Sequence, residues 1–324
     1  MTISADHFDA ERLAFVALGA IKGVGFETLK SIASSNKSYQ SVIELDDASE
    51  VRSILGRSSI SSQESSDADW RNTRKKALEN ANRKCEELAL SNVSILFRKD
   101  CGFPRQLDDL NDTPHWLFVQ GDPKVLSRPS ISVVGSRKVT EDGVWLTKYI
   151  GHCLTEFDAP TVSGLADGID QEIHIASIKA GVPTIAFLGT GIFSEYPKGS
   201  DRLRREIIDS GGAVATEYLM KESYSASNFV RRNRLQAALG KLLIPTEWAV
   251  KSGTAHTVKY AHTLTRPIAF LRTPSQASLD WVPREYLRKN GFFTIPSDQS
   301  AFFTFVSKQL KAEVKANTKQ LNLL

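Results

Sequence analysis

The pattern of apolar and polar residues becomes regular from Ser130 onward. Short apolar runs alternate with longer segments in which apolar residues recur at helical spacing. The runs predict strands over Ile131–Val134, Pro160–Ser163, Thr184–Leu188, Ala213–Thr216, Lys241–Pro245 and Pro267–Leu271. The intervening segments predict helices over Glu141–Phe157, Asp167–Ala180, Asp201–Ser210, Arg232–Leu239 and Thr254–Thr265. This alternation is typical of an α/β fold with a doubly wound parallel sheet, whose strands are buried on both faces.

The N-terminal pattern is different, because it predicts short helices only. Two apolar helical stripes are joined by the sequence GVG at residues 23–25. A helix–Gly-x-Gly–helix unit can present its hairpin amides to nucleic-acid phosphates. It can equally be a tight helix–helix turn that needs glycine for steric reasons alone. Both interpretations stay open for this segment.

Composition shifts along the chain divide it into four expected parts. The serine-rich stretch after the first helices predicts a linker, and the last fifty residues lack the regular alternation. The expected parts are an N-terminal helical domain at 1–56, a linker at 57–69, an α/β domain at 70–272 with its core at 130–272, and a C-terminal extension at 273–324 that closes with a helix at Phe302–Val314.

Composition excludes several classes of protein. The 324 residues are 41% hydrophobic and 24% charged, with a net charge of +4. No apolar run approaches the roughly 20 residues that a membrane span needs, and the polar, acidic N-terminus is unlike a secretory signal, so we expect a cytoplasmic protein. The three cysteines, Cys85, Cys101 and Cys153, are too few and too widely spaced for a disulfide framework or a zinc site. We therefore expect reduced thiols and no bound metal.

Two predicted strands end at turns of small residues. In a parallel sheet, such turns present backbone N–H groups to a phosphate at the start of the next helix. Both turns should meet at the carboxyl edge of the sheet, which is the predicted binding crevice. The residues concerned are Gly135, Ser136 and Arg137 in the first turn and Ser163, Gly164, Leu165, Ala166 and Gly168 in the second.

Charged residues beside these turns have two readings each. Arg137 can contact a phosphate in a bidentate manner, or it can brace the turn through Asp170. Asp170 and His174 are four residues apart and share a helix face, which permits acid–base chemistry. We favour phosphate contact for Arg137 and a structural hydrogen bond for the Asp170/His174 pair.

Further basic and capping residues extend the predicted phosphate site. Asn233 and its arginine neighbours are expected to open a helix, with at least one of Arg232 and Arg234 directed at the crevice. Tyr196 and Phe229 can stack on bases, although aromatic residues near strand ends are more often core. The remaining candidate phosphate ligands are Lys198, Arg231, Ser252, Gly253 and Thr254.

In this order, the turns resemble the DNA-processing protein A family, also called DprA or Smf. The resemblance covers about residues 90–272, and the ordered set of motifs is far more specific than any one of them. The matching residues are Phe103-Pro104, Leu107, Leu110, Asp112, Pro114, Leu117-Phe118 and Gly121; Val134 to Arg137 with Thr140 and Gly143; Ser163 to Ala166, Gly168 to Asp170 and His174; Leu188-Gly189 and Gly191; Tyr196-Pro197; Gly211-Gly212; Glu217-Tyr218; Phe229 with Arg232 to Arg234; Glu247; and Ser252 to Thr254.

The resemblance implies an extended Rossmann-like domain that binds single-stranded DNA, beside an N-terminal domain of the SAM or helix-hairpin-helix type. It implies a homodimer that helps to load a RecA-like recombinase or acts in DNA uptake, processing or defence, with no catalysis, cofactor or membrane. The sequence departs from the family at Pro245-Thr246-Glu247-Trp248, where Val-Glu-Ala is usual, and it shows no evident C-terminal winged helix. These departures bear on recombinase loading and the dimer more than on strand binding.

The alternative hypothesis is a nucleotide sensor or an N-glycosidic, phosphoribohydrolase-like enzyme that uses the same turns. Related hydrolases carry a catalytic glutamate after a Gly-Gly-x-Gly-Thr segment. Here Ser252-Gly253-Thr254 is followed by no glutamate, and Glu247 is the only carboxylate nearby. We therefore assign Glu247 a structural role and expect a binding protein.

Overall fold

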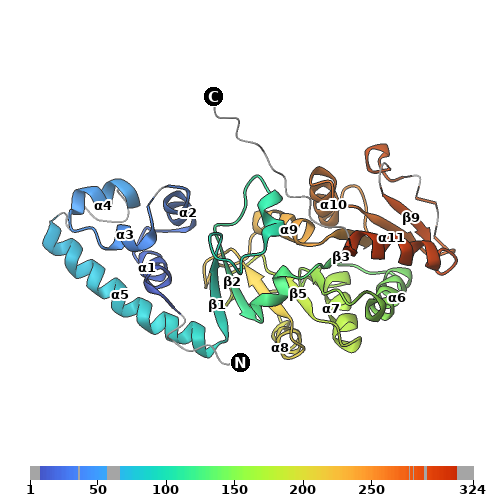
Figure 1. Cartoon of the computed structure of the whole chain (residues 1–324), viewed down its shortest axis with the longest axis horizontal. Helices are drawn as coiled ribbons and strands as arrows, with labels where there is room; N and C mark the ends of the chain where they lie inside the picture. Colours follow the sequence, from blue (N-terminus) through green and yellow to red (C-terminus); the bar gives the residue numbers. More distant parts are fainter. Residues whose placement is uncertain are drawn as a thin grey trace. The chain divides into compact units, whose positions relative to one another are not determined.

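The computed structural model describes residues 8–35, 37–56, 66–276, 278–279, 281–287 and 290–311. The chain divides into two compact units. Unit 1 comprises residues 1–127 and 184–232, and unit 2 comprises residues 128–183 and 233–324. Figure 1 labels their helices and strands. Within the described part of the chain, no helix combines the length and the apolar character that a membrane crossing requires.

The N-terminal part of unit 1 is helical, as predicted. Four helices, α1 (Ala10–Leu18), α2 (Phe26–Ser34), α3 (Tyr39–Ile43) and α4 (Ala48–Leu55), are followed by the long α5 (Asp67–Leu90). Helix α5 packs along α1, and the Trp70 indole N–H donates to the Leu45 carbonyl at 2.6 Å. Residues 57–65 of the predicted linker lie outside the described residues, whereas Ser66 caps α5. The predicted division into four parts stays a prediction.

The strands of unit 1 form a mixed arrangement. They are β1 (Val93–Phe97), β2 (Trp116–Gly121), β5 (Thr184–Phe187) and β6 (Ala213–Thr216). Strand β2 pairs antiparallel with both β1 and β6, and β6 pairs parallel with β5. Two short 3-10 helices, η2 (Arg105–Asp109) and η3 (Pro123–Ser127), flank β2, and α8 (Asp201–Asp209) precedes β6.

Unit 2 holds three parallel strands in the order β4-β3-β7: β4 (Thr161–Ser163), β3 (Ile131–Gly135) and β7 (Leu242–Glu247). Helices α6 (Glu141–Phe157), α7 (Ile169–Lys179) and α10 (Gly253–Thr263) follow these strands in sequence. Ile131, Val133 and Ile244 are fully buried, which explains why the strands read as continuous apolar runs. The predicted α/β class with a mostly parallel sheet is confirmed.

The C-terminal part of unit 2 contains a strand that the sequence did not predict. Strand β9 (Gly291–Thr294) pairs in parallel with β8 (Ala269–Arg272), with a short η4 (Arg284–Tyr286) between them. The closing helix α11 covers Gln299–Lys311, so it begins three residues before the predicted start. Phe302 and Val306 of this helix are fully buried in the core that also contains Ile131 and Ile150.

Candidate nucleic-acid interface

The two glycine turns of unit 2 lie in direct contact. A Cβ atom added to Gly135 would lie 2.5 Å from Ile169 Cγ1, and one added to Gly168 would lie 2.7 Å from the Arg137 carbonyl oxygen. Gly168 also has a φ of +84°, which other residues rarely adopt. The Ile169 N–H donates to the Ser136 carbonyl at 3.1 Å. Glycine is therefore required here because the two turns touch.

Most residues of the second turn lie beneath the surface. Ser163, Gly164, Leu165 and Ala166 are all buried, and the Ser163 hydroxyl donates to the Val133 carbonyl at 2.7 Å. Thr254 supports the first turn in a similar way, because its hydroxyl donates to the Gly135 carbonyl at 2.9 Å. Ser163 therefore supports β3 and Thr254 supports the first turn, and both hydroxyls are engaged by backbone carbonyls.

The surface of the first turn is basic. Arg137 and Lys138 are exposed, and Ser136 is half-buried. The Ser136 hydroxyl accepts from the Lys138 N–H at 3.1 Å and donates to the Lys138 carbonyl at 2.6 Å. Lys138 was absent from the sequence prediction, although its position directly after Arg137 was a sufficient signal.

Glu247 reaches the N-terminus of α6 from the end of β7. Its Oε2 atom accepts from the Thr140 N–H at 3.0 Å, and the hydroxyl of the same threonine lies 3.4 Å away. Gly143 leaves room for this carboxylate, because an added Cβ would collide with Oε2. The N-terminus of α6 is therefore occupied by the protein's own anion, to which Glu141 and Asp142 of the first helical turn add negative charge.

The N-termini of α7 and α10 differ in the number of acidic residues in the first helical turn. Helix α7 carries Asp170 and Glu172 in its first turn. Asp170 is 6% exposed and His174 is fully buried, so neither offers a surface group for acid–base work. Helix α10 has no acidic residue in its first turn, Ser252 caps it, and Gly253 is exposed beside the exposed Lys251. Of these three helix starts, that of α10 is the best suited to an anion.

The predicted start of the helix at Arg232 is wrong. Helix α9 covers Ala226–Leu239, so it begins six residues before Arg232, and the Ser225 hydroxyl caps it by accepting from the Asn228 N–H at 3.0 Å. Asn233 consequently lies inside the helix rather than at its cap, and its side-chain amide donates to the Gly253 carbonyl at 3.1 Å.

The arginines of α9 contact other groups of the protein, and two of them are buried. Arg232 is 3% exposed and donates through NH1 to the Phe187 carbonyl at 3.0 Å, and Arg234 is 1% exposed. Arg231 lies 3.4 Å from Glu217 Oε2, and its guanidinium carbon is 4.7 Å from the centroid of the Phe26 ring. The sequence did not reveal the burial of Arg232 and Arg234, and their role as phosphate ligands stays a prediction.

Aromatic side chains gather beside the exposed Lys198 in unit 1. The ring of Tyr196 lies 4.8 Å from that of Phe229 and 4.7 Å from that of Tyr224. Phe229 covers Gly189, where an added Cβ would lie 2.5 Å from its ring. Tyr224 is 61% exposed and was missed in the sequence, because it lies in a loop outside every recognised motif.

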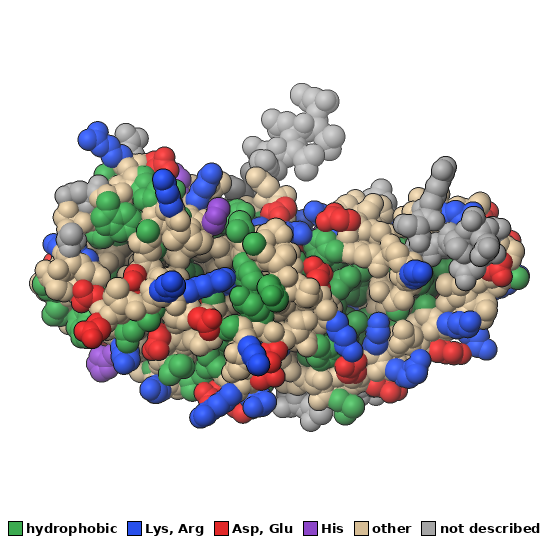
Figure 2. All heavy atoms as spheres, turned by 180° about the vertical axis from the view of Figure 1, so that it is seen from behind, with side chains coloured by type: hydrophobic (Ala, Val, Ile, Leu, Met, Phe, Trp, Pro, Cys, Tyr) green, Lys and Arg blue, Asp and Glu red, His purple; other side chains and the backbone are tan. Residues whose placement is uncertain are grey.

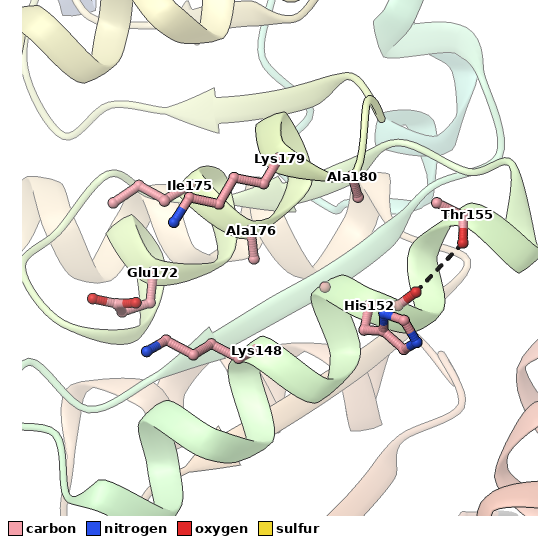
Figure 3. A pocket seen from close by; sticks show the side chains of 9 residues that line it. Lys148, His152, Thr155, Glu172, Ile175, Ala176, Lys179 and Ala180 are labelled. Atoms are coloured by element: carbon pink, nitrogen blue, oxygen red, sulfur yellow. Dashed lines mark hydrogen bonds between the residues drawn. The ribbon is translucent and has the colours of Figure 1, made fainter.

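A separate pocket of about 460 Å³ lies between α6 and α7. Figure 3 shows Lys148 and His152 on one helix facing Glu172 and Ala176 on the other. None of the predicted phosphate ligands lines this pocket. On the face drawn in Figure 2, Lys and Arg side chains are interspersed with Asp and Glu rather than gathered in one patch. On this face, therefore, no single basic patch stands out.

Sequence comparisons connect this chain to a single family. The sequence model of DNA recombination-mediator protein A matches residues 94–287. The DNA processing protein DprA of Streptococcus pneumoniae is 36% identical over 162 residues, which are 50% of this chain and 56% of the relative. Protein Smf of Escherichia coli is 33% identical over 159 residues, 49% of this chain and 42% of the relative. The chain matches about half the length of these curated relatives.

Solved structures of two DNA processing A proteins resemble this chain. The crystal structure of DNA processing protein A from S. pneumoniae superposes with a TM-score of 0.64 at 23% identity, covering 93% of this chain and 98% of that one. The DNA processing protein A of Helicobacter pylori, known for its single-stranded DNA binding mode, gives a TM-score of 0.51 at 27% identity over 58% of this chain and 83% of that one. The first likeness confirms the predicted extended Rossmann-like fold.

Proposed function

Because the chain belongs to the DNA recombination-mediator protein A family, we propose that it binds single-stranded DNA through the first glycine turn and the start of α10. The observation that carries this proposal is the link between the two. Thr254, in the first turn of α10, donates to the carbonyl of Gly135. This hydrogen bond joins the turn that carries Arg137 to the start of α10, which has no acidic residue in its first turn. The H. pylori relative supplies the ligand class.

The residues at this site divide by exposure. Arg137, Lys138, Lys251 and Gly253 are exposed, so a phosphate can approach them from the solvent. Guanidinium–phosphate contacts are strong and directional, and backbone amides at a helix start add to them. Eight other predicted ligands are buried or half-buried; they are Ser163, Gly164, Leu165, Ala166, Gly168, Asn233, Arg234 and Thr254.

Unit 1 offers a second element of the same function. Tyr196 and Tyr224 present an aromatic surface beside the exposed Lys198. Stacking of a base on an aromatic ring contributes about 1–3 kcal/mol per base and tolerates any sequence. We therefore expect sequence-independent recognition, in which phosphates meet cations and bases meet tyrosines.

Replacement of Arg137 tests the site directly. Arg137→Ala should weaken binding of a labelled dT20 about three- to tenfold at low salt, equally for mixed-sequence oligomers. It should also lower the salt slope of log K by about 0.7, because one phosphate contact on a single strand is lost. Arg71→Ala, an exposed arginine on α5, is the control and should bind like the unchanged protein. Equal affinity of the two variants would refute the proposed site.

We also propose that the protein acts as a homodimer that assists a RecA-like recombinase. Support for the dimer comes from exposed apolar side chains of unit 2, where Trp281 is 44% exposed and Phe292 is 37% exposed. Their neighbours Trp248 and Phe270 continue the aromatic cluster inward. Light scattering of Trp281→Asp should show a smaller mass than the unchanged protein, and stimulation of recombinase filament growth on coated strands should fall with it.

The competing hypothesis, a nucleotide sensor or hydrolase, is less well supported. Its required carboxylate would be Glu247, whose Oε2 atom is engaged by the Thr140 N–H. A titration separates the two hypotheses. Affinity that grows with oligomer length indicates strand binding, whereas saturation by a mononucleotide with release of its base would indicate an enzyme.

A further inference from the structure

A groove in unit 1, apart from the turns and tyrosines described above, is lined by cations from three separate segments. The cavity measures about 830 Å³ and lies among α2, the loop before α3, the end of β1 and η2. Its cations are Lys37, Arg98, Lys99 and Arg105, and its carboxylates are Glu11 and Asp108. Glu50, outside the lining, lies 2.8 Å from Lys37 Nζ, so four positive charges face three negative ones and leave an excess of one. We call this cavity the unit 1 groove.

The ion pairs within the unit 1 groove do not neutralise it. Asp108 is shared by two arginines, at 2.8 Å from Arg98 Nε and 3.5 Å from Arg105 NH1. Lys99 lies 3.2 Å from Glu11, and its side chain is 63% exposed. Glu11 is further engaged by two backbone N–H groups at the start of α3. Exposed ion pairs contribute only about 0–1 kcal/mol each, so an entering anion can replace them.

His115 lines the unit 1 groove, and the charges near it shift the pKa of its ring. Its Nε2 atom is 3.1 Å from the Ser34 hydroxyl. Burial lowers the pKa of His115 most, and the charges of Arg98 and Lys30 lower this pKa further, against an opposite effect of Glu217. A neighbouring phosphate would raise the pKa of His115, because an opposite charge favours the protonated ring.

The walls of the unit 1 groove indicate which kind of anion fits. Its two aromatic rings, Phe97 and Tyr39, are 3% and 4% exposed. Arg12 and Lys99 lie over the Phe97 ring, with their cationic centres 5.2 Å and 5.7 Å from its centroid. Neither ring is available to stack on a base. Cations spread over three segments, without a base platform, suit a chain of phosphates rather than a single nucleotide.

We propose that the unit 1 groove is a second binding site for single-stranded nucleic acid, which holds the phosphodiester backbone without reading the bases. This inference rests on the proposed function, since it assigns the same class of ligand to another surface of the chain. It adds a surface contributed by segments that the family motifs do not include, such as Lys37 and the residues around Ser34. Because the backbone alone is held, DNA and RNA strands should both bind there.

Proton NMR of the His115 ring, assigned by its loss in His115→Gln, tests the groove in the full chain. Saturation with dT20 or with U20 should move the His115 resonances and raise the pKa of this ring. The variant Arg98→Gln/Lys99→Gln should bind dT20 about five- to tenfold more weakly, with a salt slope lower by about 1.4 for two lost contacts. The matched control Arg71→Gln/Lys75→Gln removes the same charge from α5 and should change affinity less than twofold.

Three results would overturn the inference. His115 resonances that stay unchanged at saturating dT20 would exclude the groove from the interface. Equal affinity of the groove variant and its α5 control would do the same. Inorganic pyrophosphate that moves His115 as strongly as dT20 at equal phosphate concentration would mark a site for small anions instead.

The variants also separate this inference from the proposed function. If Arg137→Ala loses affinity and the groove variant does not, the groove fails and the turn site stands. If the groove variant alone loses affinity, the turn site fails and the groove stands. A protein that binds no dT20 at all would refute both.

Discussion

The contact between the two glycine turns makes a quantitative prediction about Gly168. This residue has φ +84° and ψ −132°, a region that residues with a Cβ rarely adopt. Forcing alanine into such a conformation costs about 1–3 kcal/mol. Its Cβ would also press on the carbonyl oxygens of Ser136 and Arg137. Overpacking of this kind costs about 1–3 kcal/mol more, because backbone atoms must move.

A smaller term acts in the opposite direction. Alanine restricts the unfolded chain more than glycine does, which stabilises the folded protein by about 0.4–1 kcal/mol. Gly168→Ala should therefore lower the free energy of unfolding of unit 2 by about 2–5 kcal/mol. It should also weaken dT20 binding, since the displaced carbonyls belong to the turn that carries Arg137.

Two other glycines of unit 2 allow the cost of backbone strain to be separated from the cost of overpacking. Gly181 has φ +69° but no atom within 4 Å of an added Cβ, so Gly181→Ala should cost only about 1 kcal/mol from backbone strain. Gly253 has neither a positive φ nor a neighbour, so Gly253→Ala should be neutral or stabilising by up to about 1 kcal/mol. Neither change should displace the turn of Arg137.

Urea unfolding of the three variants, followed by far-ultraviolet circular dichroism, gives the comparison. The expected order of midpoints is Gly253→Ala highest, Gly181→Ala next and Gly168→Ala lowest. A Gly168→Ala midpoint equal to that of Gly181→Ala would show that strain alone matters at this position. The claimed contact between the turns would then be refuted.

Two further predictions concern charge and thiol chemistry. Glu247→Gln should lower the free energy of unfolding by about 0.5–1.5 kcal/mol, because the Thr140 N–H loses a charge-assisted acceptor. The same change should tighten dT20 binding, because it removes a negative charge near the first turn. Unchanged or weaker binding would contradict this prediction. At pH 8, iodoacetamide should label Cys101 first, because it is exposed, whereas burial raises the pKa of Cys85 and of Cys153 to about 11 each. Mass spectrometry of the native and urea-unfolded protein measures the order, and early labelling of Cys153 would contradict it.

The sequence predicted the strands well where burial leaves a strong pattern. Strands enclosed on both faces are apolar at most positions, so β3 and β6 stand out against the amphipathic helices around them. Strand β9 was missed because its pattern is ambiguous: Phe293 is buried while Phe292 is partly exposed. Its pairing with β8 joins residues far apart in the sequence, such as Ala269 and Gly291, which no local pattern encodes.

The candidate site was predicted in its glycines and less well in its charges. A glycine turn after an apolar run is a local signal, so Gly135 and Gly168 were found. The surroundings of a charge depend on residues far away in the chain. Arg232 donates to the Phe187 carbonyl, 45 residues away, and Glu247 accepts from the Thr140 N–H, 107 residues away. Sequence spacing gives no information on either contact.

The distribution of carboxylates explains why one helix start can serve an anion while others cannot. A charge near a helix start changes stability by about 0.3–1 kcal/mol, and a carboxylate already there offsets the attraction for a phosphate. Helices α6 and α7 each carry two acidic residues in the first turn, and Glu247 adds a third to α6. Helix α10 carries none. In the proposed site, the glycine turns before α6 and α7 would therefore position the backbone and Arg137, and α10 would supply the helix dipole that attracts a phosphate.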